Sequence, residues 1–497
     1  MQSERQRADA HLVRMRALEG AAAAVIESSL YDGHPVGYPQ YDLLRAVSPG
    51  SILDVPVDVR LEILAARVVM FVRGDLMDEA VQAAEGLDAA LVTAAGDAIA
   101  CRTRMAALGA VAEAHIAAGD AVRAMRFAEA IISYTTVAPE SDALQAARWR
   151  YRGLGLQAAS YALNGRQMEA DAILDEMAGL AEAQGWDPDR AEFMAAIAEG
   201  TIAFMRLDAD RASRLSSRIR RLTVSEPTAR MLADLLEAVA LVLNGDPYRA
   251  SKLAVLVAQG VSQPTGSSLI RSYGRMLVSY IFLYEGQPVR ALAQLADMEP
   301  SERHCVDPNA PRAAAYLSMA DYRQVLTVTA ECVRMRSRHN LWLFPLILMC
   351  RSIAHLRLGH QVIALREVGE AMAYAQRANL SAVFSMIPDD EIEHMRQFVE
   401  HRAPRFAGDL QRYRVAVAEA EQRMGARGTV SEKLPKMSER ESVVASMLGG
   451  PMTFAAMAAE LHVSTGTVKR QAAAVYHKLG VKTREEAVLR LEELGYL

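Results

Sequence analysis

Cysteines, aromatic residues and long apolar runs are all scarce in this chain of 497 residues. Its four cysteines, Cys101, Cys305, Cys332 and Cys350, are too far apart for a disulfide framework or for the short ligand spacing of a zinc site. No stretch reaches the roughly 20 apolar residues that cross a bilayer, and the N-terminus lacks the apolar core of a secretory signal. We therefore expect a cytoplasmic protein with no metal and no membrane partner.

Sequence signatures of catalysis are missing as well. The chain contains no H-E-x-x-H, no G-x-S-x-G and no G-x-G-x-x-G after a predicted strand. It also lacks G-x-x-x-x-G-K-[ST], so the lysine and hydroxyl that would hold a nucleotide phosphate and Mg²⁺ are not there. We expect neither an enzyme nor a cofactor.

A strong charge of either sign is absent too. The chain has 55 Lys and Arg against 60 Asp and Glu, a net charge of −5, and 51% of it is hydrophobic. A disordered chain would be poorer in apolar residues, and a protein that coats nucleic acid along its length would be strongly basic. The length allows several globular domains, or a long repeat array with a further module.

A short phrase recurs between residues 57 and 424, which are dense in Ala, Leu, Val, Met and Arg. It consists of an apolar helix end, a Gly, and an Ala five residues later. The five regular copies are Gly119 with Ala124, Gly165 with Ala170, Gly245 with Ala250, Gly286 with Ala291, and Gly359 with Ala364. In a first copy Ala80 follows Gly74 by six residues, and weaker copies are expected at Leu207 with Ala212 and at Ala320 with Val325.

These copies indicate helical hairpins. A Gly can end a helix in a left-handed cap, and a small Ala lets the next helix approach closely. Repeated hairpins would stack into an α-solenoid. The phrase resembles the tetratricopeptide repeat, although the periods are longer and aliphatic residues replace most of its aromatic positions. An Ala-rich helical domain with ordinary Gly caps is the alternative.

The C-terminal residues differ from this array. We predict a repeat region over residues 1–424, a linker over 425–433 and a compact domain of four helices over 434–497. Its helix starts carry capping residues: Ser438 with Glu441, Thr453, Ser464, and Thr483 with Glu486. The whole chain is therefore expected to be all-α.

The third predicted helix of this domain is amphipathic. Its apolar face carries Val468, Ala472, Val475 and Leu479, and its opposite face carries Lys469, Arg470, Ala473 and His477. From residue 462 to residue 484 there are five cations and no carboxylate. A tight turn before a helix with a basic face predicts a helix-turn-helix that enters the major groove of DNA.

The same segment resembles the LuxR/FixJ-type DNA-binding domain from Met437 to Val488. The family's opening is found as Met437-Ser-Glu-Arg-Glu441, its recognition stretch as Val463-Ser-Thr-Gly-Thr-Val-Lys469, and its closing motif as Lys478-Leu-Gly-Val481. The resemblance implies a small four-helix LuxR-type domain whose third helix reads DNA, here with few hydrogen-bonding side chains along Ala472-Ala473-Ala474.

The resemblance also implies two sets of site residues. The DNA-binding set is Ser464, Thr465, Thr467, Lys469, Arg470, Gln471, Ala473, Lys478 and Arg484. The last helix commonly carries the dimer contact in this family, which here implies Ala487, Val488, Leu491 and Leu494. That stripe could equally close the small core. The expected partners are double-stranded DNA, a second copy of the chain on DNA, and RNA polymerase if the protein is an activator.

The large region resembles the helical repeats of MalT-type regulators without their ATPase. Its expected role is to receive a peptide, a small molecule or another protein. One stripe of arginines suggests a clamp for an acidic peptide or a phosphate, and the commoner interpretation is a helix face paired with neighbouring acids. The stripe is Arg211, Arg214, Arg218 and Arg221.

Two functions fit these features of the sequence. The first is a transcription regulator in which the repeats control a DNA-binding domain. The second is a protein-interaction scaffold with a vestigial helix-turn-helix. Residues 431–497 carry nine Lys and Arg against eight Asp and Glu, so the acidic balance lies in the repeat region. We therefore expect DNA contact only in the C-terminal domain.

Overall fold

The fold is described from a computed structural model of the chain. It describes residues 2–30, 38–96, 99–136, 143–187, 192–222, 227–260, 267–300, 306–336, 339, 341–377, 380, 384–427, 437–450, 452–461 and 463–493. These residues form 25 α-helices and two 3-10 helices, and they contain no strand. The prediction of an all-α fold is confirmed. Across the same residues, none of the helices combines the length and the apolarity needed to span a membrane.

The first part of the chain alternates helices with short turns. Its helices are α1 (Gln2–Leu30), α2 (Tyr38–Arg45), η1 (Pro49–Ile52), α3 (Val57–Arg73), α4 (Met77–Thr93), η2 (Ala94–Gly96), α5 (Cys101–Ala117), α6 (Ala121–Thr136), α7 (Ala143–Leu163), α8 (Gln167–Ala183), α9 (Phe193–Met205) and α10 (Ala209–Leu222).

The same alternation continues to residue 427. The helices of this part are α11 (Pro227–Leu243), α12 (Pro247–Gln259), α13 (Ser268–Tyr284), α14 (Pro288–Leu295), α15 (Asn309–Ser318), α16 (Tyr322–Val328), α17 (Ala330–Arg334), α18 (Phe344–Arg357), α19 (Gln361–Arg377), α20 (Asp389–Glu400) and α21 (Pro404–Arg427). Helix α21 extends three residues into the expected linker, whose other residues lie outside the described part of the chain.

Eight turns in this region share one backbone conformation. A residue with positive φ, between 55° and 84°, stands in each turn: Asp75, Gly119, Gly165, Leu207, Gly245, Gly286, Ala320 and Gly359. The N–H of the following residue donates to the carbonyl five positions earlier, at 2.7–2.9 Å in all eight turns. This is the bond that closes a helix in a Schellman motif. The weak copies expected at Leu207 and Ala320 are therefore confirmed as turns.

The first turn corrects the register of the repeated phrase. Gly74 has φ −80° and is still helical, while Asp75 takes the left-handed conformation. Asp is tolerated there better than most residues, and tertiary contacts hold it in place. Its carboxylate accepts the backbone N–H of Ser268 at 2.6 Å and pairs with Arg271. Ala80 thus follows the left-handed residue by five, as in the other copies.

Each of these turns joins two helices that pack against each other. The pairs are α3 with α4, α5 with α6, α7 with α8, α9 with α10, α11 with α12, α13 with α14, α15 with α16, and α18 with α19. The residue five positions after each left-handed residue is completely buried, and it is Ala in seven pairs and Val325 in the other. A small side chain there allows the close contact within the pair.

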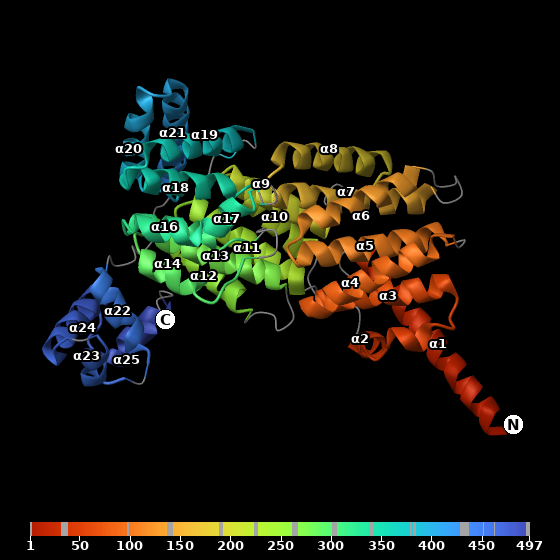
Figure 1. Ribbon diagram of the computed structural model, residues 1–497. Helices are drawn as coiled ribbons and strands as arrows, with labels where there is room; N and C mark the ends of the chain where they lie inside the picture. Colours follow the sequence, from red (N-terminus) through yellow and green to blue (C-terminus); the bar gives the residue numbers. More distant parts are fainter. Residues whose placement is uncertain are drawn as a thin grey trace.

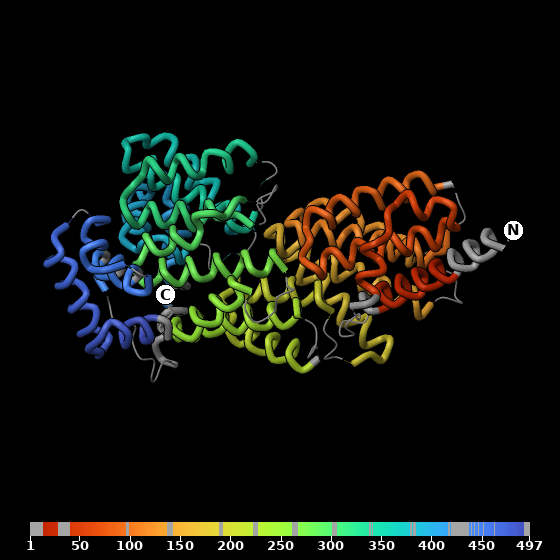
Figure 2. Tube along the Cα trace, turned by 90° about the horizontal axis from the view of Figure 1, so that it is seen from below, coloured from red at the N-terminus to blue at the C-terminus, as the bar shows by residue number. Residues whose placement is uncertain are grey.

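The pairs also pack in sequence. The first helix of one pair contacts the first helix of the next, in the series α3, α5, α7, α9, α11, α13, α15 and α18. Figure 1 shows the pairs side by side from α3 to α19. In the view of Figure 2 the molecule is elongated, with α1 at one end and the last four helices at the other.

Distant turns are tied together across this array. Gly165, in the α7–α8 turn, lies against the segment before α18, where Leu341 N–H donates to the carbonyl of Asn164 at 3.2 Å. A Cβ at Gly165 would lie 2.6 Å from the backbone nitrogen of Trp342. Gly is therefore required there for close approach as well as for its positive φ.

A buried ion network lies under the first half of the array. Arg152 of α7 donates to Glu113 of α5 at 2.6 Å and pairs with Glu192, the residue that caps α9. All three side chains are more than nine-tenths buried. Burial raises the pKa of Glu192 against the effect of Arg152. One cation thus joins three consecutive helical pairs.

Candidate nucleic-acid interface

Four short helices form a separate apolar core at the C-terminal end. They are α22 (Glu439–Leu448), α23 (Phe454–Glu460), α24 (Thr465–Leu479) and α25 (Arg484–Glu493). Helix α24 contacts each of the other three. Tyr248 of α12 packs against this core, so the repeat region and the four helices touch.

The sequence sets the start of each of these helices through its capping residue. Ser438 and Glu441 form a capping box at α22, and Thr453 accepts the N–H of Ala456 at 3.2 Å at α23. Ser464 accepts the N–H of Thr467 at 3.1 Å at α24. These predicted caps are confirmed, and each satisfies an N–H that would otherwise have no partner in the helix.

The cap of α25 is reciprocal. Thr483 accepts the N–H of Glu486 at 3.1 Å, and the Glu486 carboxylate accepts the N–H groups of Lys482 and Thr483. Those two backbone bonds hold the pKa of Glu486 below its ordinary value. The capping box expected from Thr483 and Glu486 is confirmed.

Helix α24 turns one face inward. Its four expected core residues, Val468, Ala472, Val475 and Leu479, are at most 9% exposed. Gly480 closes the helix with φ 71°. The burial of this face fixes the rotation of the helix about its axis and so determines which positions face away from the core.

The opposite face of α24 is open to solvent. Ser464, Thr465, Lys469, Arg470 and Ala473 are exposed, and Thr467 and Gln471 are partly exposed. Ser464 and Thr467 also share a hydrogen bond of 2.8 Å between their hydroxyl oxygens. Among the residues that the structure describes, Lys469 and Arg470 have no ion-pair partner. This face can offer two cations and the N-terminal end of a helix to an anionic surface.

Lys478, expected to contact phosphate, has an internal partner. Its ammonium group lies 2.6 Å from a carboxylate oxygen of Glu441, the acid of the first capping box. The ion pair joins the end of α24 to the start of α22. The positive charge of Lys478 is therefore partly neutralised within the domain.

Arg484, also expected at the interface, is used inside the domain. Its Nε donates to the carbonyl of Leu448 at 3.0 Å, Nη2 to Gly450 at 2.8 Å and Nη1 to Met452 at 2.8 Å. The guanidinium thus holds the segment between α22 and α23. It supports the position of α23 and leaves no donor nitrogen uncommitted.

The expected dimer stripe of α25 points mainly into the domain. Ala487 and Leu491 are fully buried in its core, and Val488 is half-buried against it. Leu494 lies outside the described residues. Leu489, which lies on the same helix but off the core stripe, is 61% exposed.

Two of the four arginines in the α10 stripe form ion pairs with neighbouring helices. Arg211 lies 3.4 Å from Glu199 and 3.5 Å from Asp171, and Arg218 lies 2.7 Å from Glu199. These pairs join α10 to α8 and α9, as in the commoner interpretation of the stripe. Arg214 and Arg221 are exposed.

Two hollows lie between the helices before residue 428. An apolar cavity of about 90 Å³ lies between α9, α11 and α13, with Trp342 in its wall. A larger one, of about 570 Å³, lies between the end of α13, α15, α20 and α21, and its lining includes Tyr284, Phe384 and Arg414. Arg414 is paired there with Asp389 and Glu393.

Comparison with known proteins adds nothing to this geometry, because the sequence matches no family model and no curated protein. What the site can do chemically therefore depends on its own residues. It presents a rigid helix with an exposed basic face beside a capped N-terminus, which suits a polyanion better than a small molecule.

Proposed function

We propose that the protein is a DNA-binding transcription regulator, in which the last four helices bind double-stranded DNA and the helical repeats control them. The observation that carries the proposal is the exposed face of α24 with Lys469 and Arg470, opposite a fully buried apolar face. The motifs from Met437 to Val488, which resemble the LuxR/FixJ type, support the same function.

The proposed contact places α24 in the major groove. Lys469 and Arg470 would donate to guanine O6 and N7 or to phosphates, and a good base contact discriminates by about 1–3 kcal/mol. Thr465 and the first N–H groups of α24 would lie on a phosphate. Gln471 and Ala473 complete the reading face, which offers few hydrogen bonds and so favours shape-assisted recognition.

The remaining members of the interface have supporting roles in this proposal. Arg484 positions α23, and Lys478 joins α24 to α22 through Glu441. Lys482 is exposed after the end of α24 and is available to phosphate. On DNA, a homodimer would read two half-sites about one helical turn apart, with Leu489 as the apolar contact of α25.

The repeat region is proposed to be an α-solenoid of tetratricopeptide-like hairpins that receives a signal. The uniform turns, the buried Ala at each pair and the contacts between successive first helices support this assignment. A ligand in the larger hollow would contact α13, α15, α20 and α21 together, and α21 leads to the C-terminal helices. RNA polymerase is a further partner if the protein activates transcription.

A mobility-shift assay on genomic fragments tests the proposal with the full-length chain. We expect specific shifts that weaken steeply as salt rises, because phosphate contacts release counterions. Lys469→Ala with Arg470→Ala should abolish the specific shift. The control is Lys252→Ala with Arg440→Ala, which removes two exposed cations from α12 and α22 and should leave binding nearly unchanged.

Two results would contradict the proposal. Equal losses in both double variants would mean that only net charge matters and that α24 does not read DNA. A wild-type chain that binds DNA only non-specifically, yet forms a stable complex with a protein, would support the interaction scaffold instead.

A further inference from the structure

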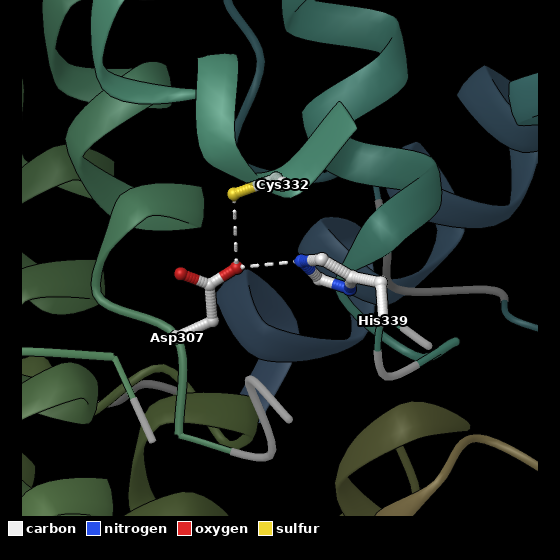
Figure 3. A group of neighbouring side chains, drawn as sticks. All are labelled: Asp307, Cys332 and His339. Atoms are coloured by element: carbon white, nitrogen blue, oxygen red, sulfur yellow. Dashed lines mark hydrogen bonds and ion pairs between the residues drawn. The ribbon is translucent and has the colours of Figure 1, made fainter. Parts of the chain in front are cut away.

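Three buried side chains with metal-binding atoms meet in the second half of the repeat array. Asp307 lies just before α15, Cys332 lies on α17, and His339 lies between α17 and α18. One donor atom from each residue lies within 4.8 Å of the other two. Figure 3 shows the carboxylate of Asp307 between the sulfur of Cys332 and the ring of His339.

The distances in this group fit a metal ion. Asp307 Oδ2 lies 3.1 Å from His339 Nε2 and 3.7 Å from Cys332 Sγ. Tetrahedral zinc has bonds of about 2.0 Å to nitrogen and oxygen and about 2.3 Å to sulfur, which gives ligand separations of about 3.3–3.5 Å. The two separations that involve Asp307 Oδ2 therefore lie within a few tenths of an ångström of these values, and the sulfur and the ring nitrogen lie within 4.8 Å of each other.

Asn309 and Arg312 orient the side chains of Asp307 and Cys332. In metal sites, such hydrogen bonds from outside the ligand set orient the ligands in the same way. Asn309 N–H donates to Asp307 Oδ1 at 3.0 Å, which leaves Oδ2 facing the other two residues. The Asn309 amide nitrogen lies 3.9 Å from Cys332 Sγ, and Arg312 donates to the Asn309 oxygen at 3.0 Å, which fixes that direction. An N–H aimed at sulfur stabilises a thiolate, the form that binds metal.

We propose that Asp307, Cys332 and His339 form a binding site for one Zn²⁺ ion. The mixture of thiolate, imidazole and carboxylate is typical of zinc and is too soft for Mg²⁺ or Ca²⁺. Two anionic ligands neutralise the dication, which a fully buried site requires. Within the described part of the chain, no fourth His, Cys, Asp or Glu joins the group.

Binding is a ligand exchange with no redox step. The Cys332 thiol loses a proton to solvent and His339 would bind through Nε2 as a neutral imidazole, while zinc gives up waters and forms bonds to sulfur, nitrogen and oxygen. The hydrogen bonds that now link Asp307 to the other two residues are replaced by the metal.

A catalytic role for the three residues does not fit their surroundings. The side chains of Asp307 and His339 have no exposed surface, and Cys332 is completely buried. The His339 ring lies against Phe344, with centroids 4.7 Å apart. A substrate therefore cannot reach the sulfur.

The site would stabilise the array at its least regular point. Helices α16 and α17 have only seven and five residues, and the stretch before Asp307 is the longest break between hairpins in the sequence. A zinc ion bonded to the three segments would hold α15, α17 and the start of α18 together. This role is independent of DNA binding by the C-terminal helices.

Metal analysis of the full-length chain tests the proposal. Protein purified without chelator and dialysed against zinc-free buffer should retain about one zinc per chain and should unfold at a lower temperature after a strong chelator removes it. Cobalt added to the stripped chain should give the absorption of a cobalt–thiolate bond.

The matched variants are Cys332→Ser and Cys350→Ser. Both cysteines are completely buried, but Cys350 on α18 is not part of the group. Cys332→Ser should lower the retained zinc more than about tenfold and abolish the cobalt–thiolate absorption, while Cys350→Ser should leave both unchanged.

The proposal would be overturned by a wild-type chain that retains no more zinc than Cys332→Ser and whose unfolding temperature zinc does not raise. Because that comparison includes the unmodified chain, it stands even if a variant fails to fold. Equal zinc in all three proteins would place the metal elsewhere and would equally refute the site.

Discussion

Three arginines of the repeat region and two cations of helix α24 differ in what they contact. In the repeats, Arg152, Arg211 and Arg218 are paired with carboxylates of neighbouring helices, so their charges serve to hold helices together. In the C-terminal helices, Lys469 and Arg470 extend from α24 into solvent. An acidic chain can thus have an exposed basic face, because the position of the charges decides what an anion meets.

The sharpest test of this contrast is Arg152→Ala. It removes the single cation between Glu113 and Glu192 and leaves two buried carboxylates without compensation, which costs about 3–5 kcal/mol. Arg150→Ala, on the same helix, is the control: its pair with Glu176 is exposed and is worth about 0–1 kcal/mol. Denaturant unfolding followed by circular dichroism measures both changes.

Similar losses for the two variants would show that the buried network does not hold the pairs together. The expected difference in unfolding free energy between Arg152→Ala and Arg150→Ala concerns the repeat region alone. DNA binding by Arg152→Ala, measured at a temperature where the variant is folded, should therefore match that of the wild type.

A smaller loss of stability is expected from Arg484→Ala. This variant tests whether Arg484 stabilises the fold of the C-terminal helices or contacts DNA. Three carbonyls between α22 and α23 would lose their donor, at a cost of about 1–3 kcal/mol to the C-terminal helices. Lys482→Ala removes a nearby exposed cation and should not change stability. Thermal unfolding of the two variants separates the roles.

Weaker DNA binding by Arg484→Ala with an unchanged unfolding temperature would contradict the assignment to the fold. It would return Arg484 to the DNA-binding set that the family resemblance implies.

The C-terminal helices show which features could be predicted from the sequence and which could not. The caps at Ser438, Thr453, Ser464 and Thr483 and the buried face of α24 were predictable, because capping and helix periodicity depend on residues a few positions apart. The partners of Arg484 lie 32–36 positions away, so no local pattern indicates them. The family resemblance implies a DNA contact for Arg484, and that prediction says nothing of these internal hydrogen bonds.

The repeat region shows the same limit. The spacing of five residues from the turn to a buried Ala was visible, even in the copies at Leu207 and Ala320. The shift of the left-handed conformation from Gly74 to Asp75 was not visible in the sequence, because it depends on contacts with Ser268 and Arg271 almost 200 positions later. The group of Asp307, Cys332 and His339 was missed for a related reason: its spacing matches no compact metal motif.

The turns themselves offer a matched pair of substitutions. Ala320 is exposed with φ 57°, which costs a residue with a side chain about 1 kcal/mol, so Ala320→Gly should stabilise the repeats by about that amount. Gly359 has φ 84° and open space around it, so Gly359→Ala should destabilise them by about 1 kcal/mol through strain alone. Chemical denaturation measures the free energy of unfolding of both variants. If Ala320→Gly and Gly359→Ala changed it in the same direction, the two turns would not be equivalent.

The smallest expected effect compares two glutamates at opposite ends of helices. Glu285 follows the last residue of α13, and burial raises its pKa to about 7 although Arg290 opposes this. Its folded pKa lies above the unfolded value of about 4.3, so its stabilising contribution is complete below about pH 4 and is lost as the pH rises through 7. Glu486, at the start of α25, has a lowered pKa and contributes in the opposite sense, present at neutral pH and lost as the pH falls. Glu285→Gln should therefore flatten the decline in unfolding temperature between pH 5 and 8. Glu486→Gln should lower the unfolding temperature most at neutral pH and least in acid. Parallel pH profiles for the two variants would contradict the comparison, because the repeats and the C-terminal helices would then hold their acids in the same way.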